Sequence, residues 1–168
     1  YQAATTQMQY SGMGTTLVAA VFHDNHVSVA HLGDSRMYRL REGQLAQITK
    51  DHSLLQEQMD LGIITPAQAK QSMNKNLVTR GLGVEGPVDP EIHDHPVKVG
   101  DIYLLCSDGR TDMVADEEIG LALSMLAANL PLCAQQLVQM ANDSGGRDNT
   151  SVILVKVKQA FPASVGWW

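Results

Sequence analysis

The sequence predicts an α+β domain in which helices cover antiparallel sheets, and three observations carry this prediction. Short apolar runs alternate with turn residues over the first 50 positions, as in consecutive hairpins. The pattern then becomes helical over residues 51–76. A continuous apolar run at residues 101–106 precedes two helical patterns and a closing strand, so the last helices follow strands against which they can pack.

The first half of the chain is expected to hold two hairpins. Their four strands are expected at residues 17–22, 27–32, 37–40 and 45–48. Asp24 and Asn25 lie at the centre of the first turn, and both tolerate the positive φ of a tight hairpin. The second turn is expected at Glu42 and Gly43.

The later elements are expected to be mostly helical. Thr65, Pro66 and Gln68 form the capping-box start of the second helix in the insert at residues 51–76. Asp116 is expected to cap the next helix. A strand buried on both faces is expected at residues 101–106, helices at 117–128 and 131–141, and a last strand at 151–157. The apolar tail at residues 160–168 is expected either to dock on the domain or to be disordered.

Composition limits the functions that the chain supports. With 44% hydrophobic residues and no run of about 18 apolar residues, residues 1–168 are expected to form one cytoplasmic domain without a membrane span. The net charge of −6 and the lack of a basic block argue against nucleic-acid binding and suit a role with cations. Tyr1 is not Met and no signal-peptide pattern follows, so the chain is expected to begin partway into a gene product.

Acidic turns recur beside the apolar strands. Asp34 and Asp108 each follow a strand, Asp148 precedes the last strand, and Asp112 lies four residues beyond Asp108. Taken singly, each is explained by turn chemistry, since Asp beside Gly is common in tight turns. If the strand ends converge, the carboxylates repel one another and a bound cation relieves that repulsion. Oxygen ligands favour hard ions such as Mg²⁺ or Mn²⁺, and spacing alone leaves both explanations open.

Five segments resemble, in order and spacing, the consecutive motifs of the metal-dependent serine/threonine protein phosphatases of type 2C, the PPM family, and its bacterial stand-alone members in particular. They are GMGTT at 12–16, HLGDSR at 31–36, TRGLG at 79–83, LCSDG at 105–109 and GRDNTS at 146–151. One such segment would be a weak signal, but five in the family's order leave little room for chance.

The resemblance implies a four-layer α-β-β-α sandwich with two central antiparallel sheets and a metal site at one rim. It implies that Asp108 and Asp148 hold a pair of catalytic Mn²⁺ or Mg²⁺ ions. Asp34, Asp108 and Asp112 match the acids that hold a third, weaker ion. The insert at residues 51–76 matches the family's flap, a segment beside the active site.

The implied activity is hydrolysis of phosphoserine and phosphothreonine on proteins. In the family, two metal ions share a bridging water, lower its pKa and position it for in-line attack, so that no phosphoenzyme forms. The implied partners are phosphoprotein substrates of a cognate Ser/Thr kinase.

The family's first motifs have no counterpart in the chain. A phosphate-binding Arg and an Asp that bridges both metals are expected upstream, together with N-terminal strands of the sandwich that are missing from this chain. The chain alone is therefore expected to have little or no phosphatase activity. The absent segment precedes it in a longer protein, accompanies it as a separate chain after cleavage, or is truly lacking; unpaired central strands disfavour the last explanation.

Two other functions were weighed against this one. A non-catalytic phosphatase-like module would bind a partner or phosphopeptide, but it has no need to keep all four acids. The second alternative is a zinc site built from His23, His26, His31, His93, Asp94 and His95. These residues are explained equally well as polar groups of a hairpin turn and of a loop at 93–95, and His31 as a residue that packs or hydrogen-bonds near the rim. Arg36 is expected either to orient Asp34 or to lie on the surface.

Overall fold

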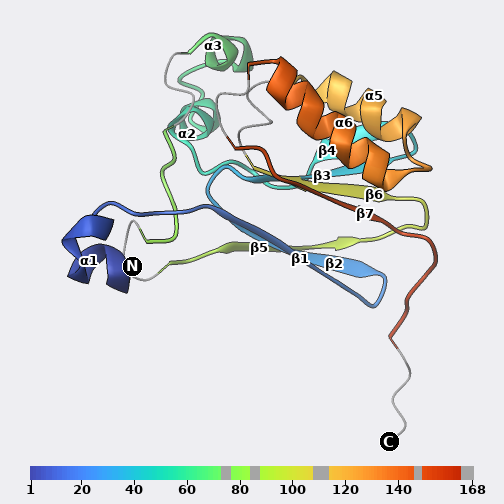
Figure 1. Ribbon diagram of the computed structural model, residues 1–168, viewed down its shortest axis with the longest axis horizontal. Coiled ribbons are helices and arrows are strands. Elements are labelled where there is room, and N and C mark those ends of the chain that lie inside the picture. Colours follow the sequence, from blue (N-terminus) through green and yellow to red (C-terminus); the bar gives the residue numbers. More distant parts are fainter. Residues whose placement is uncertain (73–76, 84–87, 108–113, 146–148, 164–168) are drawn as a thin grey trace, which may run out of the picture.

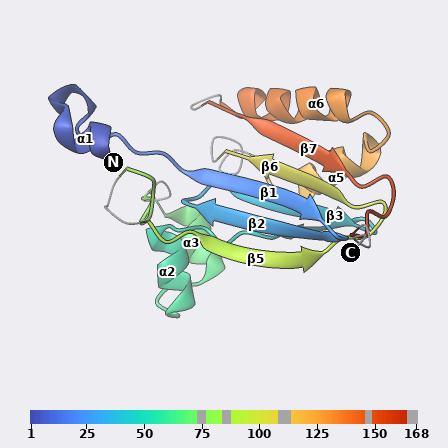
Figure 2. The same ribbon diagram turned by 90° about the horizontal axis from the view of Figure 1, so that it is seen from below.

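Two antiparallel β-sheets pack face to face in the computed structural model, which describes residues 1–72, 77–83, 88–107, 114–145 and 149–163 (Figures 1 and 2). Two helices, which Figure 1 labels α5 (Asp116–Met125) and α6 (Leu130–Asp143), cover the outer face of the four-stranded sheet. Within the described ranges no helix covers the outer face of the three-stranded sheet. The predicted α+β sandwich of two antiparallel sheets is therefore confirmed.

Seven strands form the two sheets in the described part of the chain. The three-stranded sheet has the order β1-β2-β5, with β1 at Leu17–His23, β2 at His26–Leu32 and β5 at Glu91–Pro96. The four-stranded sheet has the order β4-β3-β6-β7, with β3 at Arg36–Arg41, β4 at Gln44–Gln47, β6 at Ile102–Cys106 and β7 at Val152–Lys156. The chain first passes from one sheet to the other at residues 33–35, between β2 and β3.

The helices fall into three groups along the chain. They are α1 (Gln2–Thr6) with the short 3-10 helix η1 (Met8–Tyr10), then α2 (Leu54–Asp60) with α3 (Pro66–Gln71), then α5 (Asp116–Met125) with α6 (Leu130–Asp143). The capping box of α3 is confirmed, because Thr65 Oγ1 accepts from Gln68 N and Gln68 Oε1 accepts from Thr65 N. Among the described helices, none combines the length and apolar character that crossing a bilayer requires.

Strand β6 lies at the centre of the core. Ile102, Leu104 and Cys106 pack with side chains of α5 and α6, whereas Tyr103 and Leu105 pack with Val27 and Val29 of the opposite sheet. All five residues of β6 are buried. A strand buried on both faces reads as a continuous apolar run, which is why the sequence predicted it directly.

Both hairpin turns have the backbone geometry expected from their residues. Asp24 and Asn25 have φ values of 44° and 57°, and Glu42 and Gly43 have 52° and 77°. Positive φ at both central residues is the type I′ pattern, which matches the twist of the flanking strands. The first turn also holds the tail, because Asn25 Oδ1 accepts from Phe161 N at 2.8 Å. The tail therefore docks as far as residue 163, and residues 164–168 lie outside the described residues.

Two predictions about local structure were wrong. Residues 93–95 belong to β5, not to a loop, and they pair with β2 through their backbone. The mostly exposed β5 carries polar side chains that show no apolar alternation, so its side chains gave no strand signal. Asp116 is the first residue of α5 rather than its cap, because Ala115 occupies the cap position.

Gly33 should be the most sensitive glycine of the rim. It has a φ of 97°, and a Cβ at this position would lie 2.3 Å from Thr16 Cγ2. Gly33→Ala should lower the free energy of unfolding by roughly 2–4 kcal/mol, from backbone strain together with overpacking. Gly43→Ala is the matched control, since its φ is 77° but nothing lies within 4 Å of its Cβ. Urea denaturation of both variants checks this, and an equal loss in the two would contradict it.

Asp101 should make stability depend on pH. Arg41 donates to both of its carboxylate oxygens at 2.8 and 2.7 Å, and Asp101 is 1% exposed. Burial raises the pKa of this carboxyl group, but the hydrogen bonds from Arg41 and Lys98 N lower it further than burial raises it. Removing the negative charge with Asp101→Asn should cost about 3 kcal/mol at pH 7.

The pH window follows from the direction of this shift. Because the folded pKa lies below the unfolded value of about 3.9, the stabilisation is complete above that value and is lost as pH falls through the folded pKa. The difference in unfolding free energy between wild type and Asp101→Asn should be constant from about pH 5 to 8 and narrow below about pH 4. Denaturant titrations at several pH values measure it, and a difference that grows on acidification would contradict the assignment.

Candidate functional site

The predicted ligand Asp34 lies in the turn where the chain leaves the three-stranded sheet for the four-stranded sheet. Residues 33–35 form this connection, and we call them the Asp34 turn. Asp34 and Ser35 are each 8% exposed. A buried carboxylate requires hydrogen bonds, a cationic side chain or a bound cation, because burial penalises an isolated charge.

One family-like segment, 12–16, lies against the Asp34 turn, and a second, 79–83, lies against segment 12–16. Thr16 Oγ1 and Ser35 Oγ are 2.8 Å apart and share a hydrogen bond. Thr15 and Leu82 exchange backbone hydrogen bonds, with N to O distances of 2.9 and 2.8 Å. The fold thus joins segments 12–16, 31–36 and 79–83, which are far apart in the sequence, at one rim of the sandwich.

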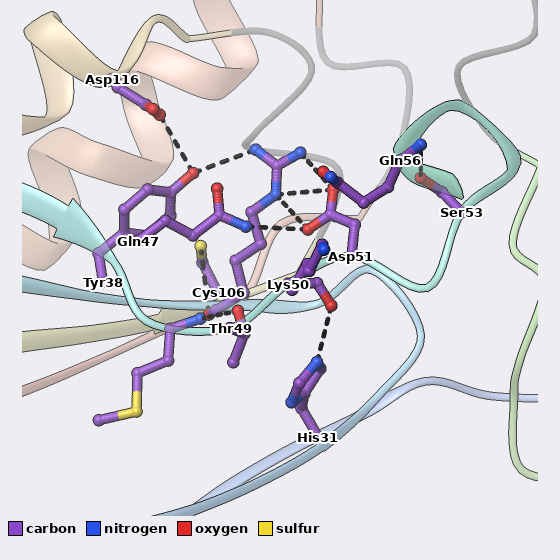
Figure 3. Close-up of polar contacts among 12 residues, drawn as sticks. His31, Tyr38, Gln47, Thr49, Lys50, Asp51, Ser53, Gln56, Cys106 and Asp116 are labelled. Atoms are coloured by element: carbon purple, nitrogen blue, oxygen red, sulfur yellow. Dashed lines mark hydrogen bonds and ion pairs between the residues drawn. The ribbon is translucent and has the colours of Figure 1, made fainter. Parts of the chain in front are cut away.

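Residues 48–52 run beside the Asp34 turn and both of its flanking strands, and we call them the 48–52 segment. The contacts reach both sides of the turn. Figure 3 draws those of Met37 N with Thr49 Oγ1 (3.0 Å) and of His31 Nε2 with Lys50 O (2.7 Å). The others join Ile48 N to Met37 O (2.7 Å) and His52 N to Gly33 O (2.9 Å). Because this segment leads directly into α2, the base of the helical insert is bonded to the Asp34 turn.

Arg36 joins the 48–52 segment to the helical layer (Figure 3). Its Nε donates to Asp51 Oδ1 at 2.8 Å, and its Nη1 donates to Tyr38 Oη, which in turn donates to Asp116. Burial lowers the pKa of Arg36, but the hydrogen bond to Asp51 and the neighbouring charge raise it further than burial lowers it, so the guanidinium stays charged. The side chain is 21% exposed and binds Asp51, so Arg36 is neither a free surface residue nor shown to orient Asp34.

A second polar cluster consists of His31, His52 and Glu91. The two imidazole rings stack with centroids 4.8 Å apart, and Glu91 Oε2 lies 3.0 Å from His52 Nε2 and 3.9 Å from His31 Nε2. Hydrogen bonds from His93 and His52 lower the pKa of Glu91 to about 2. Burial lowers the pKa of His31, which favours its neutral form. Within the described residues, this is the one group of three metal-ligating side chains whose ligand atoms lie within 4.8 Å of one another.

In this cluster the hydrogen-bond partners place a hydrogen, rather than a lone pair, on Nε2 of His31 and of His52. Lys50 O and the Glu91 carboxylate only accept, so Nε2 of each histidine carries the hydrogen. Gly33 N donates to His52 Nδ1 at 3.2 Å, which requires an unprotonated Nδ1. Both ring nitrogens of His52 are thus engaged, Nδ1 by Gly33 N and Nε2 by Glu91, so His52 has no lone pair left for a metal. The cluster is therefore a hydrogen-bonded arrangement and does not fit a preformed metal site.

The six-residue zinc site considered from the sequence is not assembled by the described residues, since His31 alone among its members belongs to the three-residue group. His23 Nε2 instead bonds Ser28 Oγ at 2.8 Å, and Ser28 donates to Asp94. His26 Nδ1 bonds Asp24 O, within its own turn. His93 bonds Glu91. The polar-residue explanation accounts for these contacts.

Asp108, Asp112 and Asp148 lie outside the described residues, so the structure neither supports nor opposes their predicted roles. Their described neighbours are bonded to one another. Ser107 Oγ donates to Asn149 O and accepts from Ser151 N, both at 3.1 Å. Strand β6 ends and strand β7 begins here, with Cys106 paired to Val152.

Sequence reasoning missed the residues that support the Asp34 turn. The sequence places Asp51 and His52 at the start of a helical insert, whereas both lie before α2. His52 bonds Gly33 of the turn, and Asp51 bonds Arg36, the first residue of β3. Glu91 was missed because β5 was not recognised. The available signal was an Asp-His pair shortly after the strand predicted at residues 45–48, but its partners are 15 to 39 residues away.

Comparison with known proteins identifies the fold family. The family model described as protein phosphatase 2C matches residues 1–146. The chain belongs to this family. Serine/threonine phosphatase stp of Listeria welshimeri is 41% identical over 153 residues, which cover 91% of this chain and 60% of that protein. The chain thus spans less than two thirds of the length of this relative.

Solved structures of family members agree with the fold. The serine/threonine phosphatase PstP/Ppp of Mycobacterium tuberculosis superposes with a TM-score of 0.87 at 38% identity, covering 93% of this chain and 65% of that one. The catalytic domain of PstP in complex with two manganese ions gives a TM-score of 0.82 at 37% identity, covering 93% and 64%. The recognition of a type 2C phosphatase from the five motifs is confirmed.

The Arg36–Asp51 pair should matter more for stability than an exposed ion pair of the same insert. Asp51→Ala leaves a largely buried guanidinium without its carboxylate and should lower the free energy of unfolding by roughly 2 kcal/mol. Asp60→Ala is the control, because its pair with Lys50 is exposed on both sides and should contribute little. Thermal and urea denaturation compare the two, and equal effects would contradict the prediction.

Proposed function

We propose that the full-length gene product hydrolyses phosphoserine and phosphothreonine on proteins with the help of two Mn²⁺ or Mg²⁺ ions. Membership of the protein phosphatase 2C family supports this, as does the relative whose structure holds two manganese ions. The observation in this chain that carries the proposal is the hydrogen bonding of Ser107 to Asn149 and Ser151. Ser107 directly precedes Asp108 and Asn149 directly follows Asp148, so the bonded residues are the sequence neighbours of the two proposed ligands.

The proposed ligand set suits hard cations. Asp108 and Asp148 would hold the catalytic pair, and Asp34 would join Asp108 and Asp112 around a third, weaker ion. Carboxylate oxygens favour Mn²⁺ or Mg²⁺ over softer metals. Asp34 is 8% exposed and lies in the connection between the two sheets, where its carboxylate would face this ion.

Each part of the rim would contribute to catalysis through position and charge. When bound, the ions would activate a water molecule for direct attack on phosphorus and neutralise charge on the phosphoryl oxygens. The 48–52 segment would hold Asp34 in place, and the hydrogen bond from Arg36 would fix the position of Asp51. The insert at residues 51–76 would act as the flap beside the site, within the single domain formed by residues 1–168.

The proposed setting is bacterial signalling in the cytoplasm. The substrates would be phosphoproteins of a cognate Ser/Thr kinase, in agreement with the names of the relatives. The 168-residue chain alone would have little activity, since it spans about 60% of the Listeria relative. The segment that supplies the phosphate-binding Arg and bridging Asp would be part of the same protein or a separate chain.

Manganese-dependent hydrolysis of a chromogenic phosphate ester tests the proposal. The full-length gene product should be active, and Asp108→Ala should reduce kcat/KM by about 100-fold or more, because metal stabilisation of the transition state contributes several kcal/mol. Asp143→Ala at the exposed end of α6 is the control and should be unchanged. Equal rates for wild type and Asp108→Ala would favour the alternative, a non-catalytic module that binds phosphopeptides.

A further inference from the structure

The backbone N–H and the backbone carbonyl of Gly33, the residue before Asp34, both form a hydrogen bond with His52. His52 N donates to Gly33 O at 2.9 Å, and Gly33 N donates to His52 Nδ1 at 3.2 Å. Gly33 also has a φ of 97° and lies in tight contact with Thr16. The position of the Asp34 backbone is therefore set by His52 more directly than by any strand pairing, because β2 ends at Leu32 and β3 begins at Arg36.

The hydrogen bond from Gly33 requires one tautomer of His52. The Nδ1 atom accepts from Gly33 N, so the ring proton must be on Nε2. Glu91 Oε2 lies 3.0 Å from that Nε2, and a carboxylate can only accept. The two partners therefore select the same tautomer from opposite sides of the ring.

The surroundings hold this arrangement in place. His52 is 6% exposed and its ring stacks on His31, which is itself bonded to Lys50 O. Glu91 uses its other carboxylate oxygen to accept from His93 Nε2 at 2.7 Å. Neither His52 nor Glu91 belongs to the five family-like motifs, and neither is among the proposed metal ligands.

We propose that His52, held in its Nε2-protonated tautomer by Glu91, is a positioning residue that sets the affinity of the Asp34 turn for the weaker divalent cation. The proposal rests on the proposed function in one respect, the role of Asp34 as a ligand of that ion. Outer partners that orient a ligand typically change metal affinity by roughly 10- to 100-fold when they are removed.

Nitrogen-15 NMR of the imidazole ring tests the tautomer in the wild-type protein without any activity assay. The Nδ1 resonance of His52 should have the shift of an unprotonated nitrogen, and Nε2 that of a protonated one. A protonated Nδ1 would overturn the proposal. So would a rise in melting temperature on adding Zn²⁺ that is lost in Glu91→Ala, because zinc would occupy the lone pair assigned to the proton.

An isosteric pair of variants tests the positioning role in the full-length protein. Calorimetric titration with Mn²⁺ should show the weaker binding phase of His52→Leu reduced about tenfold or more, with the tight phase unchanged. His52→Asn keeps an acceptor near the Nδ1 position and should lose clearly less. Equal losses in the two variants, or a loss confined to the tight phase, would contradict the proposal.

Glu91 should act through His52. Glu91→Ala should weaken the same Mn²⁺ phase in the wild-type background and have no further effect in His52→Leu, as expected for residues coupled in one network. Additive effects would contradict this. If the wild type binds Mn²⁺ as described but hydrolyses no phosphate ester, the proposed function fails while the positioning role stands. If the wild type is active and His52→Leu binds Mn²⁺ normally, the positioning role fails while the proposed function stands.

Discussion

The rim of this protein depends on the pairing of residues 48–52 with residues 31–37. This pairing fixes a chain crossing between two sheets, where neither sheet can hold the backbone by itself. His52 and Lys50 bond the residues before Asp34, and Asp51 and Thr49 bond those after it. The 48–52 segment therefore fixes the backbone on both sides of the buried Asp34.

Strand β3 carries an arginine at each end, and each arginine binds a carboxylate. Arg36 at its first position pairs with Asp51 at the rim, and Arg41 at its last position pairs with Asp101 at the opposite end. Both carboxylates are largely buried, and each accepts hydrogen bonds from its arginine through both oxygens. Such pairs specify geometry more than they add stability, because desolvation offsets much of their attraction. They join the first residue of β3 to the 48–52 segment and its last residue to Asp101.

The same pairing relates the helical insert to the Asp34 turn. The insert leaves the body immediately after His52, and Thr79 N returns to bond His52 O on the other side of the insert. The base of the insert and the Asp34 turn are therefore both bonded to His52. A displacement of the insert should therefore shift the Asp34 turn through these hydrogen bonds, and the converse also holds. Cation binding and the position of the insert can influence each other by this route.

The sequence by itself determined the elements whose signal is local. The two hairpins follow from Asp24-Asn25 and Glu42-Gly43, α3 follows from its capping box, and β6 follows from its unbroken apolar run. The five motifs also identified the family and proposed four acids as ligands. Only the tertiary structure revealed β5, because an edge strand with polar side chains is held by backbone pairing that leaves no periodic pattern. It alone brought Asp51, His52 and Glu91 to the Asp34 turn, since contacts made across 15 to 39 residues depend on how the sheets are stacked and not on spacing along the chain.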